Sequence, residues 1–216
     1  MSVFLSVVLT ASVLLALVHF RWLEKPSSHP RALLKMLPVL LLSGYALALH
    51  APLLAVALAL AALGDLCLAY DGEGSFIAGL LAFLLSHIAY VALFWPHADL
   101  ALIVESPWRY AFAWLFVILA GLLLLILWRS AGKLALPVAV YAAAIIAMAL
   151  SALSVRPMMP GVAATLFVMS DTALGLQRFV VKPADPMMKR LKPFVWVTYY
   201  AAQLIFTLAI AGMPRF

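Results

Sequence analysis

The chain has 216 residues, of which 68% are hydrophobic and only 10% are charged, and its mean hydropathy is +1.15. A soluble domain of this length needs far more polar residues to cover its surface, so the composition excludes a soluble enzyme or binding module. The net charge of +6 would suit a nucleic-acid-binding protein. In a chain this apolar, basic loops beside a membrane explain it better, and no nucleic-acid partner is predicted.

Apolar runs near twenty residues long follow one another along the whole chain. A helix of about twenty apolar residues crosses the ~30 Å hydrocarbon layer of a bilayer. The eight predicted spans are residues 2–20, 32–49, 51–70, 76–95, 108–128, 134–153, 160–180 and 193–212. The first lacks a basic n-region and a cleavage site, so we interpret it as a retained helix. We predict an all-α, polytopic membrane bundle that forms a single transmembrane domain over residues 1–216.

Basic residues in the loops predict the orientation of these spans. Eleven lie on one side, namely Arg21, Lys25, Arg31, Lys35, Arg129, Lys133, Arg178, Lys182, Lys189, Arg190 and Lys192. Only Arg109, Arg156 and Arg215 lie on the other. Because cytoplasmic loops are enriched in Lys and Arg, both termini are predicted to lie outside the cytoplasm, in a multi-pass protein of a bacterial plasma membrane.

Two stretches suggest an internal repeat. "KMLPVLLLSGY", from Lys35, resembles "KLALPVAVY", from Lys133, and the pair Gly64-Asp65 has a counterpart in Ser170-Asp171. Four spans separate the partners, so both copies would run in the same direction. A duplicated four-helix unit with parallel topology explains this pattern. Chance similarity in an Ala/Leu-rich sequence is the alternative.

Asp65 and Asp171 are carboxyl groups inside predicted spans. On insertion scales such a charge costs about 2.5–3.5 kcal/mol at the centre of a helix, so these residues normally point inward and have partners or functions. Burial near a second carboxylate would let one of the two retain a proton at neutral pH. The two aspartates are therefore candidate functional residues, predicted to approach each other. Alternatively, each only bonds a neighbouring hydroxyl or caps a broken helix.

The fourth span carries a stripe of small, aromatic and polar residues at helical spacing. Its members are Gly79, Phe83, Ser86, His87 and Tyr90. Such a stripe faces other helices or a cavity rather than lipid, and Gly79 allows close helix approach. His87 is either a functional group or part of an interhelical hydrogen bond.

Polar groups also occur on three other spans. Lys35 either snorkels to the interface or contacts a lipid phosphate. Trp196, Tyr200, Gln203 and Thr207 form a stripe on the last span, where Gln203 could simply join two helices. Tyr141 lies in register with Ile145 and Met148, as expected for helix packing. With no H-E-x-x-H motif and no Cys/His cluster, no zinc site and no cofactor are predicted, although a metal held by aspartates stays open.

The order and spacing of these motifs resemble the YhhN family of membrane proteins. The resemblance rests on Gly64-Asp65, on Phe76-x-x-Gly79-x-x-x-Phe83-x-x-x-His87-x-x-Tyr90, on Ser170-Asp171 and on Tyr200-Ala-Ala-Gln203. It extends from Lys35 to Gln203. Characterised members are lysoplasmalogenases, so the resemblance implies hydrolysis of the vinyl ether bond of a lysophospholipid, giving a fatty aldehyde and a glycerophospho-ethanolamine or -choline.

Enol ether hydrolysis needs a protonated acid, a carboxylate that stabilises a cation, and a base for water. We expect Asp65 to be the acid, because leucines flank it and no cation lies within a turn of its own helix. Asp171, near Arg178, then stabilises the cation or activates water, and His87 orients groups or relays protons. The predicted substrate-binding residues are Lys35, Tyr90, Tyr141, Tyr200 and Gln203.

Two other classes of protein fit the same residues. A proton-coupled transporter also uses buried Asp and His as relay groups, and a non-catalytic lipid-binding protein would have the same helices. Aldehyde production separates these alternatives, because only the enzyme makes a product.

Overall fold

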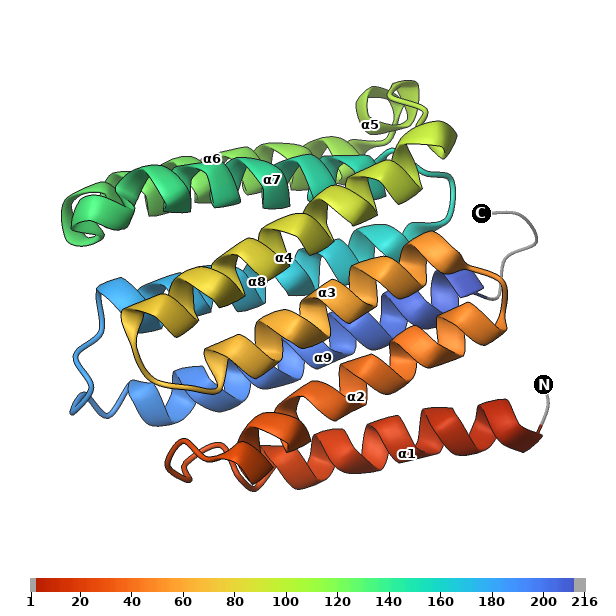
Figure 1. Ribbon diagram of the computed structural model, residues 1–216. Coiled ribbons are helices and arrows are strands. Elements are labelled where there is room, and N and C mark those ends of the chain that lie inside the picture. The colour runs from red at the N-terminus through yellow and green to blue at the C-terminus, as the bar shows by residue number, and fades with distance from the viewer. Residues whose placement is uncertain (1–2, 212–216) are drawn as a thin grey trace. The chain divides into compact units, whose positions relative to one another are not determined.

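The computed structural model describes residues 3–211, which are almost entirely helical (Figure 1). The long helices are α1 (Val3–Phe20), α2 (His29–Ala48), α3 (Pro52–Leu68), α4 (Glu73–Phe94), α6 (Pro107–Ser130), α7 (Ala135–Leu153), α8 (Met158–Phe179) and α9 (Met188–Ala211). Short helical turns are η1 (Trp95–His97), α5 (Ala101–Glu105) and η2 (Gly132–Leu134). No strand occurs in the part of the chain that the structure describes, so the all-α prediction is confirmed.

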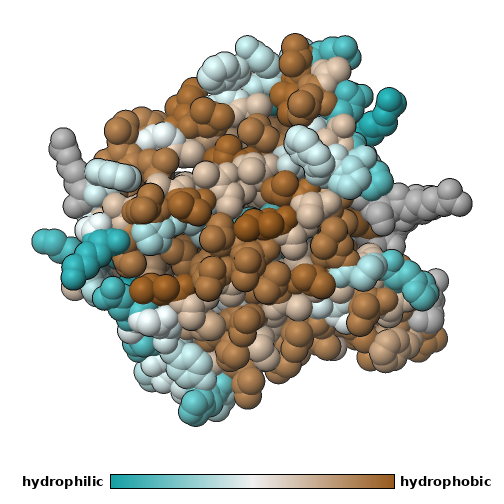
Figure 2. Space-filling model, turned by 45° about the horizontal axis from the view of Figure 1, so that its top comes forward, coloured by the Kyte–Doolittle hydropathy of each residue, from teal (hydrophilic) through white to brown (hydrophobic). Residues whose placement is uncertain are grey.

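Seven helices within residues 3–211 are long and apolar enough to cross a membrane. The eighth candidate, α3, has 17 residues, which is at the lower limit for a span. Figure 2 shows hydrophobic side chains covering most of one face of the molecule, with hydrophilic residues gathered toward its edges. The chain is a multi-pass membrane protein, and a membrane crossing by α3 stays a prediction.

Contacts between residues divide the chain into two compact units. The first unit holds the residues up to Leu93 together with the end of α9 from Phe206, and the second holds Phe94–Ile205. The division after Leu93 falls between the two predicted four-helix halves of the chain, whereas the end of α9 is grouped with the first unit. Whether the halves are copies of one another stays a prediction.

Buried hydroxyl groups join neighbouring helices in the first unit. Ser12 of α1 donates to the carbonyl oxygen of Pro38 in α2, and Ser43 of α2 donates to that of Ala55 in α3, each at 2.7 Å. Such bonds satisfy polar groups that the hydrocarbon layer cannot. They hold α1, α2 and α3 as antiparallel neighbours.

Glycines allow α3 and α4 to pack closely. A Cβ atom added to Gly64 would lie 2.5 Å from the ring of Phe83, and one added to Gly79 would lie 2.6 Å from Leu68. The sequence-based prediction that the α4 stripe faces other helices is thereby confirmed. The lack of a side chain at Gly64 sets the spacing of the helix that carries Asp65.

We expect Gly64→Ala to destabilise the protein by about 1–3 kcal/mol, because overpacking forces Phe83 or a helix to move. Gly44→Ala is the matched control, since a Cβ at Gly44 has no atom within 4 Å. Thermal unfolding in detergent measures both variants. Equal melting temperatures would show that α3 and α4 tolerate a wider spacing.

In the second unit, hydrogen bonds of the Arg109 side chain join the start of α6 to the end of α7. Its buried guanidinium donates to the carbonyl oxygens of Leu153, of Val155 at 2.6 Å and of Arg156 at 2.8 Å. The last carbonyls of a helix have no partners within the helix and carry a partial negative charge. From the sequence, Arg109 entered only the charge count for the orientation of the spans. In the structure its side chain binds the carbonyl oxygens at the end of α7.

Candidate active site

In the first unit, Asp65 forms an ion pair with Lys35 of the preceding helix. Lys35 Nζ lies 3.3 Å from Asp65 Oδ1, and the Asp65 side chain is only 2% exposed, against 19% for Lys35. Asp65 is three residues from the end of α3, so the pair lies about one turn inside the unit. Aspartates inside a membrane normally point inward and pair with another group, and Asp65 does both.

This ion pair changes two interpretations made from the sequence. Lys35 turns toward Asp65, so snorkelling to the interface is not the main role of its side chain. The assignment of Asp65 as the proton-carrying acid considered only cations along its own helix. The ammonium group on α2 stabilises the ionised form of Asp65 and removes the basis of that assignment.

His87 and Tyr90 are fully buried in the first unit. Both lie farther than Asp65 from the loop that joins α3 to α4. Ser86 donates to the carbonyl oxygen of Ala57 at 2.8 Å, and Ala57 precedes Asp65 by eight residues. His87 therefore lies on the order of 10 Å from Asp65 along the helix axes. Tyr90 is one turn farther on, where its ring stacks on Phe206 at 4.6 Å. The structure does not bring either residue to the Asp65 carboxyl group.

In the second unit, Asp171 accepts a hydrogen bond from Tyr141 of the preceding helix. The distance from Tyr141 Oη to Asp171 Oδ2 is 2.5 Å, and both residues are partly buried. Ile145 and Met148, on the same face of α7, are buried as predicted for helix packing. Tyr141 is thus a direct neighbour of one candidate catalytic residue.

The two donor–carboxyl pairs occupy corresponding positions in their helices. Lys35 and Tyr141 are each the seventh residue of α2 and of α7. Asp65 and Asp171 are each the fourteenth residue of α3 and of α8. The motif similarity had matched Lys35 with Lys133, which lies in η2 before α7. In both units a donor on one helix meets a carboxyl group on the next, although the two donors differ chemically.

Tyr200 and Gln203 are buried in α9, farther along the helix than the level of Asp171. Ser170 donates to the carbonyl oxygen of Val195 at 3.0 Å, which fixes the register of α8 and α9. Tyr200 and Gln203 follow Val195 by five and eight residues, or roughly 8 and 12 Å along the helix. They line the same helix face as Trp196, on which Tyr200 stacks at 5.9 Å.

No group of three His, Cys, Asp or Glu side chains within residues 3–211 is arranged to hold a metal ion. At the two carboxyl groups, side chains of the protein can supply proton transfer and electrostatic stabilisation of a cation. Whether Asp65 and Asp171 approach each other stays a prediction.

Comparisons with known proteins find one family. The YhhN family model matches residues 30–210. A human protein named lysoplasmalogenase TMEM86B is 32% identical over 192 residues, which cover 85% of this chain and 76% of that protein. A Mycobacterium bovis protein named lysoplasmalogenase is 33% identical over 156 residues, which cover 70% of this chain and 57% of that protein. No solved structure matches.

Proposed function

Because the chain belongs to the YhhN family, we propose that it is a membrane-embedded lysoplasmalogenase. It hydrolyses the vinyl ether bond of a lysoplasmalogen to a fatty aldehyde and glycerophosphoethanolamine or glycerophosphocholine. The names of its relatives support the reaction. The observation in the structure that carries the proposal is the buried Lys35–Asp65 ion pair, one turn inside the end of α3. The vinyl ether of a lysophospholipid lies at this depth, just below the head group.

The reaction proceeds through a carbocation. A proton is transferred to the second carbon of the alkenyl chain, which leaves an oxocarbenium ion at the carbon bonded to oxygen. Water adds to that carbon and loses a proton, and the resulting hemiacetal collapses to the aldehyde and the glycerol hydroxyl. Glycosidases divide the corresponding duties between two carboxyl groups.

We assign Asp65 as the carboxylate that stabilises the oxocarbenium ion and accepts the proton of the attacking water. The Lys35 ammonium at 3.3 Å keeps Asp65 ionised before the cation forms. This reverses the assignment made from the sequence, because that assignment did not include the Lys35 ammonium on the neighbouring helix.

Asp171 is then the acid that protonates carbon. The Tyr141 hydroxyl holds one oxygen of the Asp171 carboxyl group, which orients the other oxygen toward the alkenyl chain. The other predicted site residues lie about two helical turns from the two carboxyl groups, where they would line the path of the hydrocarbon chain rather than touch the reacting bond. They are His87, Tyr90, Tyr200 and Gln203.

Aldehyde release by the purified protein in detergent tests this function. With 1-alkenyl lysophosphatidylethanolamine as the substrate in D2O, the aldehyde should carry one deuterium at its second carbon, because protonation occurs there. The 1-O-alkyl analogue, which has no double bond to protonate, should give no product. A proton-coupled transporter would release no aldehyde, and that result would overturn the proposal.

The mechanism requires both carboxyl groups at one substrate molecule. Their equal positions in α3 and α8, two helices predicted to cross in the same direction, motivate this requirement. Spin labels on Cys67 and on a cysteine introduced at Leu174 measure the separation. We expect a mean label distance within about three helix diameters (~30 Å), because the carboxyl groups lie within about two and the labels project beyond the helices. A clearly longer distance would refute a shared site.

We also propose that both termini face away from the cytoplasm of a bacterial cell, with the basic loops inside. Eleven basic residues against three support this orientation. An alkaline phosphatase fused after Phe216 should therefore be active, because this enzyme works only outside the cytoplasm. A fluorescent protein that matures only inside should stay dark at the same position, and the opposite pattern would contradict the proposed orientation.

A further inference from the structure

Arg31 lies one helical turn from the Lys35–Asp65 ion pair. Arg31 and Lys35 are four residues apart on α2. Their contacts, Asp65 of α3 and Ala69 directly after α3, are also four residues apart. Both side chains therefore point across the same helix interface, about 6 Å apart along its axis. Arg31 is in the first turn of α2, so it lies on the outer side of the ion pair.

The guanidinium of Arg31 is incompletely paired by the protein. Its Nη1 donates to the carbonyl oxygen of Ala69 at 3.4 Å, which is a long hydrogen bond. Its Nε is buried and has no acceptor among residues 3–211. A buried charged donor without an acceptor is costly, so this atom requires an explanation.

The charge of Arg31 is not balanced by an ion pair of its own. Asp65 is paired with Lys35, while Arg31 makes no ion pair within the described residues. A group that binds here and supplies acceptors to Arg31 should therefore be an anion.

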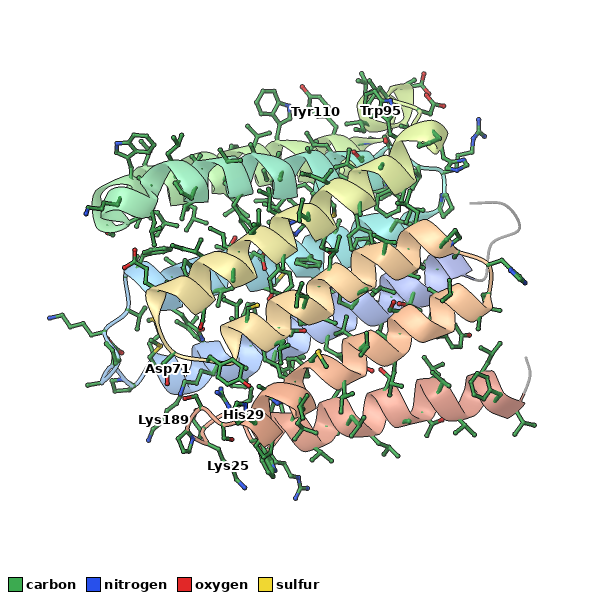
Figure 3. All side chains as sticks on the ribbon, in the orientation of Figure 1. Lys25, His29, Asp71, Trp95, Tyr110 and Lys189 are labelled. Atoms are coloured by element: carbon green, nitrogen blue, oxygen red, sulfur yellow. The ribbon has the colours of Figure 1, made fainter. Side chains whose placement is uncertain are left out.

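Two loops are fixed beside Arg31. His29 Nδ1 and Tyr70 Oη are 2.7 Å apart, and Ser27 donates to Asp71 at the same distance. Figure 3 shows His29 and Asp71 at the same end of the first unit as Lys25. These bonds join the α1–α2 loop and the first residue of α2 to the α3–α4 loop, so the protein's own side chains hold together the end of the unit that carries Arg31.

We infer that Arg31 binds the phosphate of the lysophospholipid substrate and thereby places its vinyl ether beside Asp65. Five covalent bonds join the ether oxygen of the substrate to its phosphorus, which is roughly 6 Å when extended. One turn of α2 separates Arg31 from Lys35 by the same length. A guanidinium presents a fork of N–H donors that fits two phosphate oxygens, and the unpaired Nε belongs to that fork. The inference rests on the proposed function and names the phosphate subsite of the same active site.

The test compares Arg31→Gln with the unchanged protein on two substrates, in micelles of a nonionic detergent. One substrate is 1-alkenyl lysophosphatidylcholine, and the other is 1-alkenylglycerol, which lacks the phosphate. Arg31→Gln should raise KM for the phospholipid about ten- to hundredfold, as expected for one lost charge-assisted contact, with little change in kcat. Its KM for 1-alkenylglycerol should stay within twofold of that of the unchanged protein.

Lys25→Gln is the matched control, because it removes the same charge at the same end of the unit. The Lys25 side chain lies over the ring of Trp22 at 3.8 Å and is exposed. Both KM values should stay unchanged in this variant. If Arg31→Gln raised KM equally for both substrates, Arg31 would be a structural residue. If KM rose only when phosphatidylglycerol was added to the micelles, Arg31 would be a contact to bulk lipid. Either result overturns the inference.

Binding measured without catalysis separates this inference from the proposed function. The saturated 1-O-alkyl lysophosphatidylcholine cannot be hydrolysed through a carbocation, so its effect on the melting temperature reports binding alone. This lysophospholipid should raise the melting temperature of the unchanged protein and of Lys25→Gln, but not that of Arg31→Gln. 1-O-alkylglycerol should change the melting temperature of all three proteins equally. If no aldehyde forms but this pattern holds, the proposed reaction fails and the phosphate site stands. Equal stabilisation of all three proteins by the lysophospholipid overturns the phosphate site.

Discussion

Replacing Asp171 by Asn should lower the rate of aldehyde release by about 10²–10⁴-fold, the usual cost of losing a general acid. The amide oxygen can still accept the hydrogen bond of the Tyr141 hydroxyl, so the variant should fold and insert into the membrane. An amide cannot transfer a proton to carbon, so turnover should fall while KM changes little. Initial rates of aldehyde release with a saturating lysoplasmalogen measure the effect.

Two variants accompany this experiment. Tyr141→Phe keeps the ring and removes only the hydroxyl that orients Asp171, and it should lose about tenfold in rate, comparable to one hydrogen bond. Asp185→Asn makes the same chemical change in a loop, where the carboxylate accepts a bond from the amide of Met187, and its rate should be unchanged. If Asp171→Asn kept more than about a tenth of the rate, Asp171 would be structural, because a catalytic acid contributes far more.

The apolar runs predicted the helices of this chain closely, because hydrophobicity and length decide which segments enter a membrane. The predicted span 160–180 is α8 (Met158–Phe179), and 134–153 is α7 (Ala135–Leu153). Helix α5 (Ala101–Glu105) was not predicted, because five residues are too few to show a helical period.

The composition of the site was predictable, but its register was not. Sequence periodicity identified the buried stripe with His87, yet it could not show which residue of α3 faces each residue of α4. That depends on the close contacts of Gly64 and Gly79, which place His87 about two turns from Asp65. Lys35 and Asp65 are thirty residues apart in sequence, so their pairing is a property of helix packing alone.

Asp65→Asn should also lower the rate of aldehyde release by about 10²–10⁴-fold, because the neutral amide neither stabilises the oxocarbenium ion nor accepts a proton from water. This variant leaves the Lys35 ammonium without its carboxylate, and breaking a buried ion pair typically costs about 3–5 kcal/mol of stability. A loss of activity in Asp65→Asn alone therefore does not separate catalysis from folding. Lys35→Met has the same difficulty, because it leaves the carboxylate buried beside an apolar chain.

The double variant Asp65→Asn/Lys35→Met separates the two effects. Neutral side chains of similar size often replace a buried ion pair without loss of stability, so its melting temperature should return to near that of the unchanged protein. Its rate should stay at the level of Asp65→Asn, since no carboxylate remains to face the cation. His87→Ala should lose far less, because His87 lies on the order of 10 Å from Asp65 along the helix axes. Recovery of both stability and rate in the double variant would mean that the ion pair only holds α2 to α3, and the catalytic role of Asp65 would then be wrong.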